Sequence, residues 1–332
     1  MASSENLRIL VTGSLGQIGS ELAVSLSESY GSDNIVLSDI REKSSEKLTG
    51  YGEFIKLDVV SRDDFRKIVS ENGINRVYHL AAMLSAVAEA EPRKAWKVNM
   101  EGLVNALEIC SEYGCSLFVP SSIGAFGPDT PLDNTPQDTI MRPHSMYGVT
   151  KVSGELLCDY YHLKYGVDAR GVRYPGIISS ATLPGGGTTD YAVQIFYAAV
   201  KKGSYTCYLR PDTSLDMMYM PDAIKAAIDI MEADSEKLEH RNAFNVTAMH
   251  FTPERLAEAI REHLPGFEIE YRPDPLRQGI ADSWPNYMDD SAARNEWGWE
   301  PEYDIDAMVA DMLRVLSRRH EEGKLDYTEG KS

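Results

Sequence analysis

Apolar residues in the first half of the chain gather in short runs that are separated by amphipathic stretches. The runs are LRILVT (7–12), NIVLSD (34–39), RVYHLAA (76–82), SLFVPSS (116–122) and VDARGVRYPG (167–176). Their shortness and their branched side chains favour buried strands, whereas the stretches between them have helical periodicity. Alternating strands and helices predict an α/β fold of the Rossmann type, with a doubly wound parallel sheet and right-handed crossovers.

The regular alternation weakens after residue 176. The pattern there predicts a helix over 252–264, a strand over 267–273 and an amphipathic helix over 305–323. We expect residues 1–176, with a later part from about 210 to 250, to form a main domain. Residues 177–209 and 251–325 are then expected to form a smaller mixed α/β lobe that binds the substrate over the carboxyl ends of the strands.

The composition is that of an ordinary globular protein, since 43% of the 332 residues are hydrophobic and 25% are charged. No apolar run reaches the roughly 20 residues of a membrane helix, and a net charge of -18 opposes binding to nucleic acid. The histidines form no HxH, HxxxH or HExxH pattern, so no metal is expected. The four cysteines form no CxxC pair, and no targeting segment precedes the first strand. We therefore expect reduced thiols and a cytoplasmic location, with the mitochondrial matrix as the alternative for a trimmed eukaryotic chain.

Three glycines follow the first apolar run. In VTGSLGQIG, Gly13, Gly16 and Gly19 surround Gln17 and Ile18 on the predicted turn between the first strand and the first helix. Such glycines let the backbone turn sharply and approach a pyrophosphate, whose charge then lies at the helix N-terminus. The loop therefore predicts a dinucleotide-binding site.

Acidic residues end the next two strands. Asp39 comes about 20 residues after the glycine loop, where a carboxylate binds the ribose hydroxyls of the dinucleotide. A 2′-phosphate would be repelled there, so NAD is favoured over NADP, although Arg41 keeps NADP open. Asp58 and Val59 follow the next predicted strand and fit a contact to adenine. A simple strand-end turn is the equal alternative for them.

The sequence MYGVTK places Tyr147 and Lys151 one turn apart on the same face of a predicted helix. An ammonium group beside a phenol favours the phenolate, so the tyrosine is a candidate general base for an alcohol proton while hydride leaves the same carbon. The signal becomes specific because Ser121 and Ser122 close an earlier strand and a glycine loop opens the chain.

These motifs resemble the extended branch of the short-chain dehydrogenase/reductase family, which begins with TGxxGxxG. The resemblance runs through VTGSLGQIG, HLAA, PSSIGAFG, YGVTK, RYPG and DDSAARNEWGWEPEYDID, which together cover nearly the whole chain. It implies that Ser122 binds the reacting oxygen, that Tyr147 is the base, and that Lys151 tunes Tyr147 and holds the nicotinamide ribose. The further cofactor-binding positions that it implies are Leu80, Ala81, Ala82, Asn99 and Pro175.

Several longer strings resemble the short-chain-type L-threonine 3-dehydrogenases in particular. They are GSLGQIGSEL, HLAAMLSA, RYPGIIS, PGGGTTDYAV, MMYMPDAI and FNVTAMHFTP. This resemblance implies oxidation of L-threonine at C3 by NAD, which gives 2-amino-3-ketobutyrate. It places Ser85 and Thr188 at the substrate carboxylate, Asp190 at its ammonium end, and Ser122 and Tyr147 at its alcohol. Local capping is the alternative role for Ser85 and Thr188.

Two details of the substrate side are specific to this sequence. Gly185 to Gly187 tolerate backbone excursions that other residues resist, so we interpret PGGGTTDY as a hinge followed by substrate-recognising residues. Asp216, in SLDMMYM, replaces the proline that the recognised members usually carry. We therefore expect the change to bear on the rigidity of that loop.

Two other functions are weighed against this one. A nucleotide-sugar epimerase or dehydratase of the same branch uses the same serine, tyrosine and lysine, and Arg173 or Arg210 would serve its phosphates. A protein that only senses NAD would have no need of the catalytic set. The helices that contain Leu103–Cys110 and Tyr147–Lys151 are apolar around much of their circumference. Through the resemblance they predict a homodimer, with a tetramer as the alternative.

Overall fold

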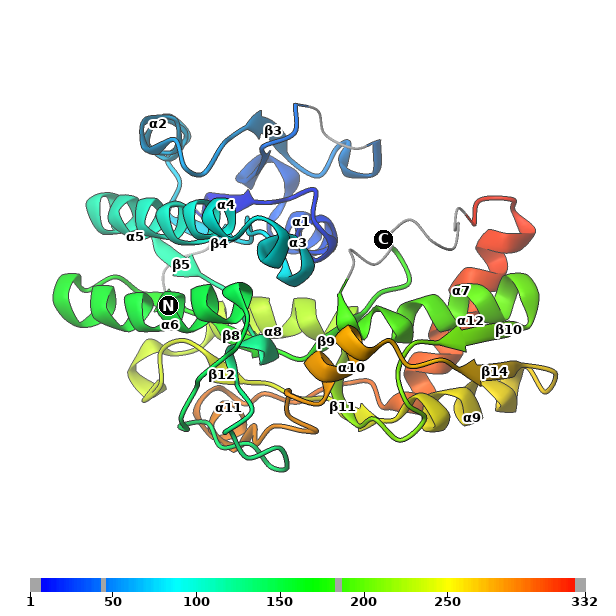
Figure 1. Ribbon diagram of the computed structural model, residues 1–332. Helices are drawn as coiled ribbons and strands as arrows, with labels where there is room; N and C mark the ends of the chain where they lie inside the picture. Colours follow the sequence, from blue (N-terminus) through cyan, green and yellow to red (C-terminus); the bar gives the residue numbers. More distant parts are fainter. Residues whose placement is uncertain (1–6, 43–45, 183–186, 326–332) are drawn as a thin grey trace.

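A parallel sheet forms the centre of the protein in the computed structural model, which describes residues 7–42, 46–182 and 187–325 (Figure 1). Its six strands follow the order β3-β2-β1-β4-β5-β7. They are β1 Ile9–Thr12, β2 Ile35–Asp39, β3 Glu53–Lys56, β4 Arg76–His79, β5 Ser116–Phe118 and β7 Ala169–Arg170. Strand β1 pairs with β2 on one side and with β4 on the other, so the chain reverses its direction of winding between β1 and β4. Ligands of open α/β sheets bind at such a reversal.

Helices cover both faces of this sheet, as the alternating pattern predicts. Leu10 and Val77 point into one apolar cluster with α2 Arg62–Glu71, α5 Gly102–Tyr113 and α6 Met146–Tyr165. Ile9, Val11 and Tyr78, which are their neighbours in sequence, point into a second cluster with α1 Gln17–Tyr30 and α8 Met220–Glu232. Because successive strand residues face opposite ways, both faces of the sheet are buried. The doubly wound Rossmann-type fold is therefore confirmed.

Two of the expected strands are interrupted. The run 116–122 forms β5 and then β6 Ser121–Ser122. The run 167–176 likewise forms β7 and then β8 Val172–Tyr174. Pro120 has no N–H for the ladder, and a Cβ on Gly171 would lie 2.0 Å from the carbonyl oxygen of Val119. Strands β6, β8 and β12 Phe244–Asn245 therefore continue as a separate small sheet. This break places the end of β6 at the cleft described below.

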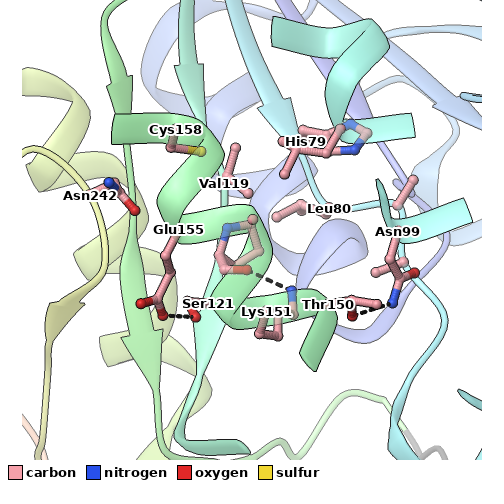
Figure 2. Close-up of a pocket in the computed structure, with 15 residues that line it drawn as sticks. His79, Leu80, Asn99, Val119, Ser121, Thr150, Lys151, Glu155, Cys158 and Asn242 are labelled. Carbon is pink, nitrogen blue, oxygen red and sulfur yellow. Dashed lines mark hydrogen bonds between the residues drawn. The ribbon is translucent and has the colours of Figure 1, made fainter. Parts of the chain in front are cut away.

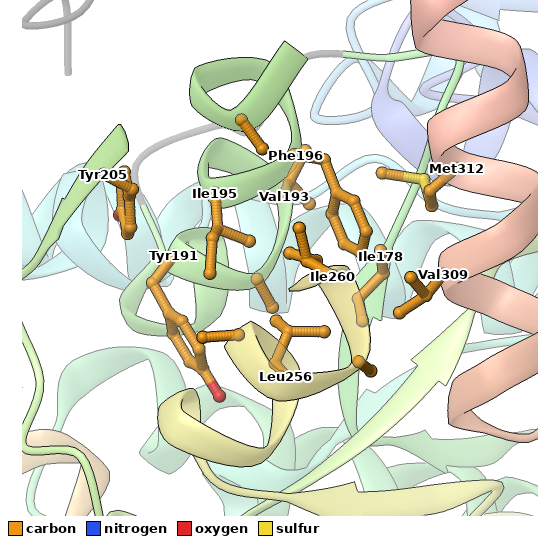
Figure 3. Packing of buried hydrophobic residues seen from close by; sticks show 14 of the residues in the cluster. Ile178, Tyr191, Val193, Ile195, Phe196, Tyr205, Leu256, Ile260, Val309 and Met312 are labelled. Carbon is orange, nitrogen blue, oxygen red and sulfur yellow. The ribbon is translucent and has the colours of Figure 1, made fainter. Parts of the chain in front are cut away.

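The later part of the chain forms its own apolar cluster (Figure 3). Tyr191 and Phe196 of α7 Tyr191–Lys202 pack there with Leu256 and Ile260 of α9 Pro253–His263, and with Met312 of α12 Ile305–Glu321. Strand β10 Ser204–Cys207 pairs in parallel with β14 Glu268–Tyr271 beside this cluster. The helices and the strand predicted from 252–323 are present, but the proposed division of the chain into domains remains a prediction.

Strand β11 Leu215–Tyr219 lies between β13 Met249–Phe251 and β9 Gly176–Ile178. Its residues alternate between the two sides, since Met217 packs in the later cluster and Met218 in the cluster under the main sheet. The remaining helical segments are α3 Ser85–Ala90, α4 Pro92–Trp96, the π-helical turn η4 Lys97–Glu101, α10 Pro275–Ala281, α11 Ser291–Trp297, and the short turns η2 Ser32–Asn34, η3 Glu46–Leu48, η5 Ile123–Ala125, η6 Thr188–Asp190 and η7 Ser235–Lys237. Within the described ranges, none of the helices has the length and apolarity that a bilayer crossing requires.

Candidate active site

A cleft opens at the carboxyl ends of the central strands and has a volume of about 250 Å³. Its walls come from the β1–α1 turn, the segment after β4, the end of β6, the start of α6, the β8–β9 segment, η6 and the loop after α10. The predicted residues that line it are Gly13, Gly16, Gln17, Ile18, Gly19, Leu80, Ala82, Ser85, Ser122, Tyr147, Lys151, Pro175, Thr188 and Asp190. The cleft therefore brings together most of the cofactor, catalytic and substrate positions that the sequence predicts.

The glycine turn is shaped by two close approaches. Gly13 has φ +69, and a Cβ on it would lie 2.8 Å from the backbone nitrogen of Ala81. A Cβ on Gly19 would lie 2.3 Å from the carbonyl oxygen of Gly13. Helix α1 begins after Gly16, which offers no side-chain cap, and its first turn contains no acidic residue. No acidic side chain of the helix's own first turn therefore opposes its positive end, which fits a pyrophosphate.

Asp39 ends β2 beside this turn and is only 6% exposed. Its Oδ2 accepts a hydrogen bond from the backbone N–H of Leu15 at 3.2 Å. Arg41 donates to both carboxylate oxygens, from Nε at 2.9 Å and from an Nη at 3.0 Å. Burial raises the pKa of Asp39, but the hydrogen bonds from Arg41 and Leu15 outweigh that effect and hold it below its usual value. The arginine that kept NADP open is thus engaged by the carboxylate that favours NAD.

The three predicted catalytic residues meet around Gly124. A Cβ on Gly124 would lie 3.3 Å from Cδ1 and Cε1 of Tyr147 and 3.5 Å from Oγ of Ser122. The Nζ of Lys151 lies 5.4 Å from the centre of the Tyr147 ring and donates a 2.7 Å hydrogen bond to the carbonyl oxygen of Pro120. Ser122 Oγ accepts from the backbone N–H of Gly124 at 3.1 Å. Its hydroxyl hydrogen is therefore available to a ligand in the cleft.

Asn99 does not line the cleft, yet it fixes one wall of it. Its side-chain amide accepts from the backbone N–H of Met83 at 2.7 Å, and donates to the Met83 carbonyl oxygen and to Oγ1 of Thr150, both at 3.1 Å. Figure 2 shows the bond to Thr150. Since Thr150 is on α6, Asn99 ties the segment after β4 to the helix that carries Tyr147 and Lys151. Ala81 likewise lies behind the wall, against Gly13.

Asp58 and Val59 also lie outside the cleft-lining set. The Oδ1 of Asp58 accepts from the backbone N–H of Val60 at 3.1 Å in the turn before α2. Val59 is buried, and its carbonyl oxygen accepts from Asn105 at 2.9 Å. The contact of these two residues to adenine stays a prediction. The alternative role, that of a residue in a turn at the end of a strand, is seen for Asp58.

The substrate-side residues occupy the opposite wall. Ser85 begins α3, and Thr188 is buried at the start of η6. The Oδ2 of Asp190 accepts from the backbone N–H of Gly187 at 2.6 Å, so this carboxylate closes the turn that carries Thr188. Tyr208 supports the same turn through a 3.2 Å hydrogen bond from its hydroxyl to the Thr188 carbonyl oxygen. Gly185 and Gly186 of the predicted hinge lie outside the described residues.

Some cleft-lining residues were missed by the sequence reasoning, and Trp284 is the most prominent. It comes from the loop after α10 and faces the cleft with Ile123, which directly follows Ser122. Neither residue belongs to a periodic pattern, and a single tryptophan in a loop gives no signal of its position. The other unpredicted lining residues are Leu84, Pro120, Ser121, Tyr174, Ile177 and Thr189, whereas Gly187 belongs to the predicted hinge.

The comparison with known proteins assigns the chain to a family. Residues 9–247 match the model of the family described as NAD dependent epimerase/dehydratase. This match covers more than half of the chain. The chain belongs to the NAD dependent epimerase/dehydratase family.

Relatives of this epimerase/dehydratase family member are similar over nearly their full lengths. An uncharacterized epimerase/dehydratase of Staphylococcus haemolyticus is 52% identical over 95% of this chain and 99% of its own. The crystal structure of L-threonine dehydrogenase from Clostridium difficile is 53% identical, covers 96% of this chain and 99% of its own, and superimposes with a TM-score of 0.93. A monomeric L-threonine 3-dehydrogenase from a metagenome is 46% identical over 93% and 99% of the two chains, with a TM-score of 0.88.

A second pocket, of about 40 Å³, adjoins the cleft of this family member and shares Leu80, Ala82, Pro120, Ser121 and Lys151 with it (Figure 2). Glu155 lines it and forms a buried ion pair with Arg173, which donates from Nε at 3.0 Å and from an Nη at 2.9 Å. Arg173 also donates to Asn245 at 3.0 Å. Burial and the nearby charge of Lys151 lower the pKa of His79, on the same cavity, to about 4.

These contacts bear on the nucleotide-sugar alternative. Arg173 is engaged in the buried ion pair behind the cleft and does not line it. Arg210 is paired with Asp282 at 2.9 Å, and it too is absent from the cleft-lining residues. Neither arginine is therefore positioned in this cleft to bind the phosphates of a nucleotide sugar.

Proposed function

We propose that this protein is an NAD-dependent L-threonine 3-dehydrogenase that oxidises the C3 alcohol of L-threonine to the ketone of 2-amino-3-ketobutyrate. The observation that carries the proposal is a cleft with Ser122, Tyr147 and Lys151 beside a glycine turn. The chain around that cleft is 53% identical to an L-threonine dehydrogenase over 99% of that enzyme's length. The reaction requires a hydride acceptor, a base for the alcohol proton and recognition of a small zwitterion.

Residues of the glycine turn and of the adjoining walls hold the cofactor in this proposal. Gly13, Gly16 and Gly19, with Gln17 and Ile18, cradle the pyrophosphate at the start of α1. The carboxylate of Asp39 binds the ribose hydroxyls after Arg41 moves aside, which the 58% exposure of the arginine side chain permits. The remaining contacts are assigned to Asp58, Val59, Leu80, Ala81, Ala82 and Pro175, with Asn99 as the residue that positions this wall.

The catalytic step uses groups whose positions the structure gives. NAD, when bound, supplies the acceptor for the hydride that leaves C3. Ser122 donates a hydrogen bond to the reacting oxygen, and Tyr147 takes the alcohol proton as the carbon–oxygen double bond forms. Lys151, whose Nζ lies 5.4 Å from the centre of the Tyr147 ring, supplies a positive charge beside this base. One proton and one hydride are removed, so atoms and charges balance.

The recognition of threonine is assigned to the opposite wall. Ser85 and Thr188 bind the substrate carboxylate through hydroxyl groups. Asp190 attracts the ammonium group while it holds the Gly187 N–H, and it thereby keeps Thr188 in place. Gly187 is assigned to the hinge of this wall, and the substrate lobe is assigned to residues 177–209 and 251–325.

A second copy of the chain is proposed to cover the exposed apolar face of α6. Val149, Leu156, Tyr160 and Leu163 follow one another at helical spacing on that face, and Leu163 is 84% exposed. An isologous pair would bury this face on both protomers. The metagenome L-threonine 3-dehydrogenase is described as monomeric, so the molar mass in solution is the measurement that decides. The homodimer predicts twice the mass of one chain, and a single-chain mass would exclude it.

An assay of the purified protein tests the function. Incubation with NAD and L-threonine should produce NADH, whereas D-threonine under the same conditions should give far less. A parallel incubation with UDP-glucose, followed for UDP-galactose, tests the nucleotide-sugar alternative. Absence of NADH formation with L-threonine, together with turnover of the nucleotide sugar, would overturn the proposal. NAD binding without turnover of either substrate would favour the sensing function.

A further inference from the structure

Asp216 is a buried carboxyl group that the catalytic scheme does not use. Instead of lying in a loop, it lies within strand β11, and its side chain is 0% exposed. A carboxyl group in a protein interior is costly unless its oxygens are hydrogen-bonded. Its two oxygens are bonded to different parts of the chain, which links three segments far apart in sequence.

The first partner is Thr247, whose Oγ1 donates to Oδ1 of Asp216 at 2.5 Å. The second is Met288, whose backbone N–H donates to Oδ2 at 2.9 Å. Met288 lies in the segment 282–290, between α10 and α11, which also carries Trp284. The carboxyl group of Asp216 therefore connects the β11 strand to the segment that places a tryptophan in the cleft.

Met288 transmits this connection by packing. It is 2% exposed and forms a small apolar cluster with Ile123 and Phe126, against which Trp284 packs. Ile123 and Trp284 both line the cleft, and Ile123 directly follows Ser122. A shift of Met288 would therefore move the wall on the substrate side, while no residue of the glycine turn on the cofactor side is a member of this cluster.

We propose that Asp216 is a positioning residue for the substrate wall of the cleft, which it sets by holding the Met288 N–H and thereby the placement of Trp284. The inference rests on the proposed function in one respect, namely that L-threonine is the substrate used to measure the effect. Asp216 does not line the cleft. Its influence is expected in the KM for the substrate and not in the affinity for NAD.

The ionisation of Asp216 gives the proposal a signature that ordinary packing lacks. Burial raises the pKa of this carboxyl group to about 8, against the hydrogen bonds from Thr247 and Met288. Two groups face it. Asp290 is paired with Arg294 at 2.8 Å. His250 lies opposite Asp216 on β13 and stacks on Tyr287. The negative charge of Asp290 adds to the effect of burial.

The sign follows from the raised pKa. The folded protein retains a proton on Asp216 that the unfolded chain releases, so the neutral carboxyl group favours the folded wall at low pH. This contribution is present in full below the ordinary aspartate pKa of 3.8 and declines between that pH and about 8, because only the unfolded chain has released the proton there. It is lost above about 8, where a charge appears in the core. The wall should therefore loosen above that pH in the wild type.

Two variants separate these effects. Asp216→Asn keeps a carbonyl oxygen for the Met288 N–H and an amide for the Thr247 hydroxyl, but it cannot ionise. Asp216→Ala leaves the Met288 N–H buried without a partner. Below pH 8 we expect Asp216→Ala to raise the KM for L-threonine about tenfold, with the NAD dissociation constant changed less than about twofold, because a lost buried hydrogen bond has effects of that size. Asp216→Asn should match the wild type there.

The pH profile provides the second readout. As the pH rises through about 8, the ratio of wild-type KM to Asp216→Asn KM should increase. Ionisation of the substrate affects both KM values equally, so it does not change their ratio at a given pH. An unchanged ratio together with a normal KM in Asp216→Ala would overturn the proposal, as would an equal loss of NAD affinity.

If Asp216→Ala does not fold, Thr247→Val removes one hydrogen bond to the carboxyl group and keeps the Thr247 backbone carbonyl that binds Trp299. It should raise the KM in the same direction, and an unchanged KM in this folded variant would count against the proposal.

A readout without substrate keeps the two proposals distinguishable. Hydrogen exchange of the Met288 amide should be faster in Asp216→Ala or Thr247→Val than in the wild type, whether or not L-threonine is oxidised. A wild type that forms no NADH while this exchange difference is present would refute the proposed function and leave the positioning role intact. Turnover by the wild type without any exchange difference would refute the positioning role alone.

Discussion

Gly13 offers a direct test of how the cofactor side of the cleft is built, because the chain contains a matched control. Gly13 and Gly114 both have φ +69. A Cβ on Gly114 would meet nothing within 4 Å, whereas a Cβ on Gly13 would lie 2.8 Å from the backbone nitrogen of Ala81. Substituting alanine at each position therefore places a side chain at the same positive φ but adds a steric clash only at Gly13.

The expected sizes follow from that difference. Alanine in the left-handed region costs roughly 1–2 kcal/mol in either variant. Crowding of a packed site adds about 1–3 kcal/mol, and this term applies to Gly13→Ala alone. The free energy of unfolding should fall by about 1–2 kcal/mol in Gly114→Ala and by about 2–5 kcal/mol in Gly13→Ala. NAD affinity should decrease at least about tenfold in Gly13→Ala. Displacement of the turn is expected to weaken the free energy of NAD binding by at least about 1.4 kcal/mol, which corresponds to that factor.

Urea unfolding of both variants and titration with NAD would measure these quantities. Gly114→Ala should bind NAD as the wild type does, because Gly114 caps α5 at the end remote from the cleft. Equal loss of stability in the two variants would show that the close approach to Ala81 has no energetic consequence. Unchanged NAD affinity in a folded Gly13→Ala protein would refute the assignment of the turn as the cofactor cradle.

Three further substitutions test individual assignments. Tyr147→Phe should bind NAD normally and lose most of kcat, since only the proton acceptor is removed; near-normal turnover would place the base elsewhere. Asp39→Ala should weaken NAD binding and reduce the preference for NAD over NADP, because Arg41 is then released from its carboxylate. An unchanged ratio of the two cofactor affinities would show that Asp39 does not set the preference. Thr188→Ala should raise the KM for L-threonine with little change in NAD affinity, and an equal loss of both would contradict its place on the substrate wall.

Much of the fold was predictable because periodicity and the glycine turn report on local structure. The sheet, its flanking helices and the cleft at the end of β1 follow from patterns within each segment. The interruption after β5 was not predicted, because an apolar run reads the same whether or not Pro120 breaks the ladder within it. The close approach of Gly171 to Val119 depends on two strands at once and leaves no trace in either segment alone.

The site was predictable where a motif fixes both residue type and position. Ser122, Tyr147 and Lys151 lie together because the end of β6 and the start of α6 bring them to one cleft. Trp284 and the hydrogen bond from Met288 to Asp216 were beyond prediction, since each depends on loops joined only by the tertiary structure. The assignment of Asn99 to the cofactor stays a prediction, and its three hydrogen bonds to Met83 and Thr150 depend on contacts that the sequence does not reveal.

The central claim is that this cleft oxidises L-threonine with NAD, and a stoichiometric product analysis tests it most directly. The wild-type protein with NAD and L-threonine should form one NADH for each molecule of 2-amino-3-ketobutyrate, detected together with its decarboxylation product aminoacetone. The Tyr147→Phe protein, shown by titration to bind NAD, should form neither at a comparable rate. NADH and ketone at equal rates in both proteins, or neither product from a wild type that binds NAD, would contradict the account.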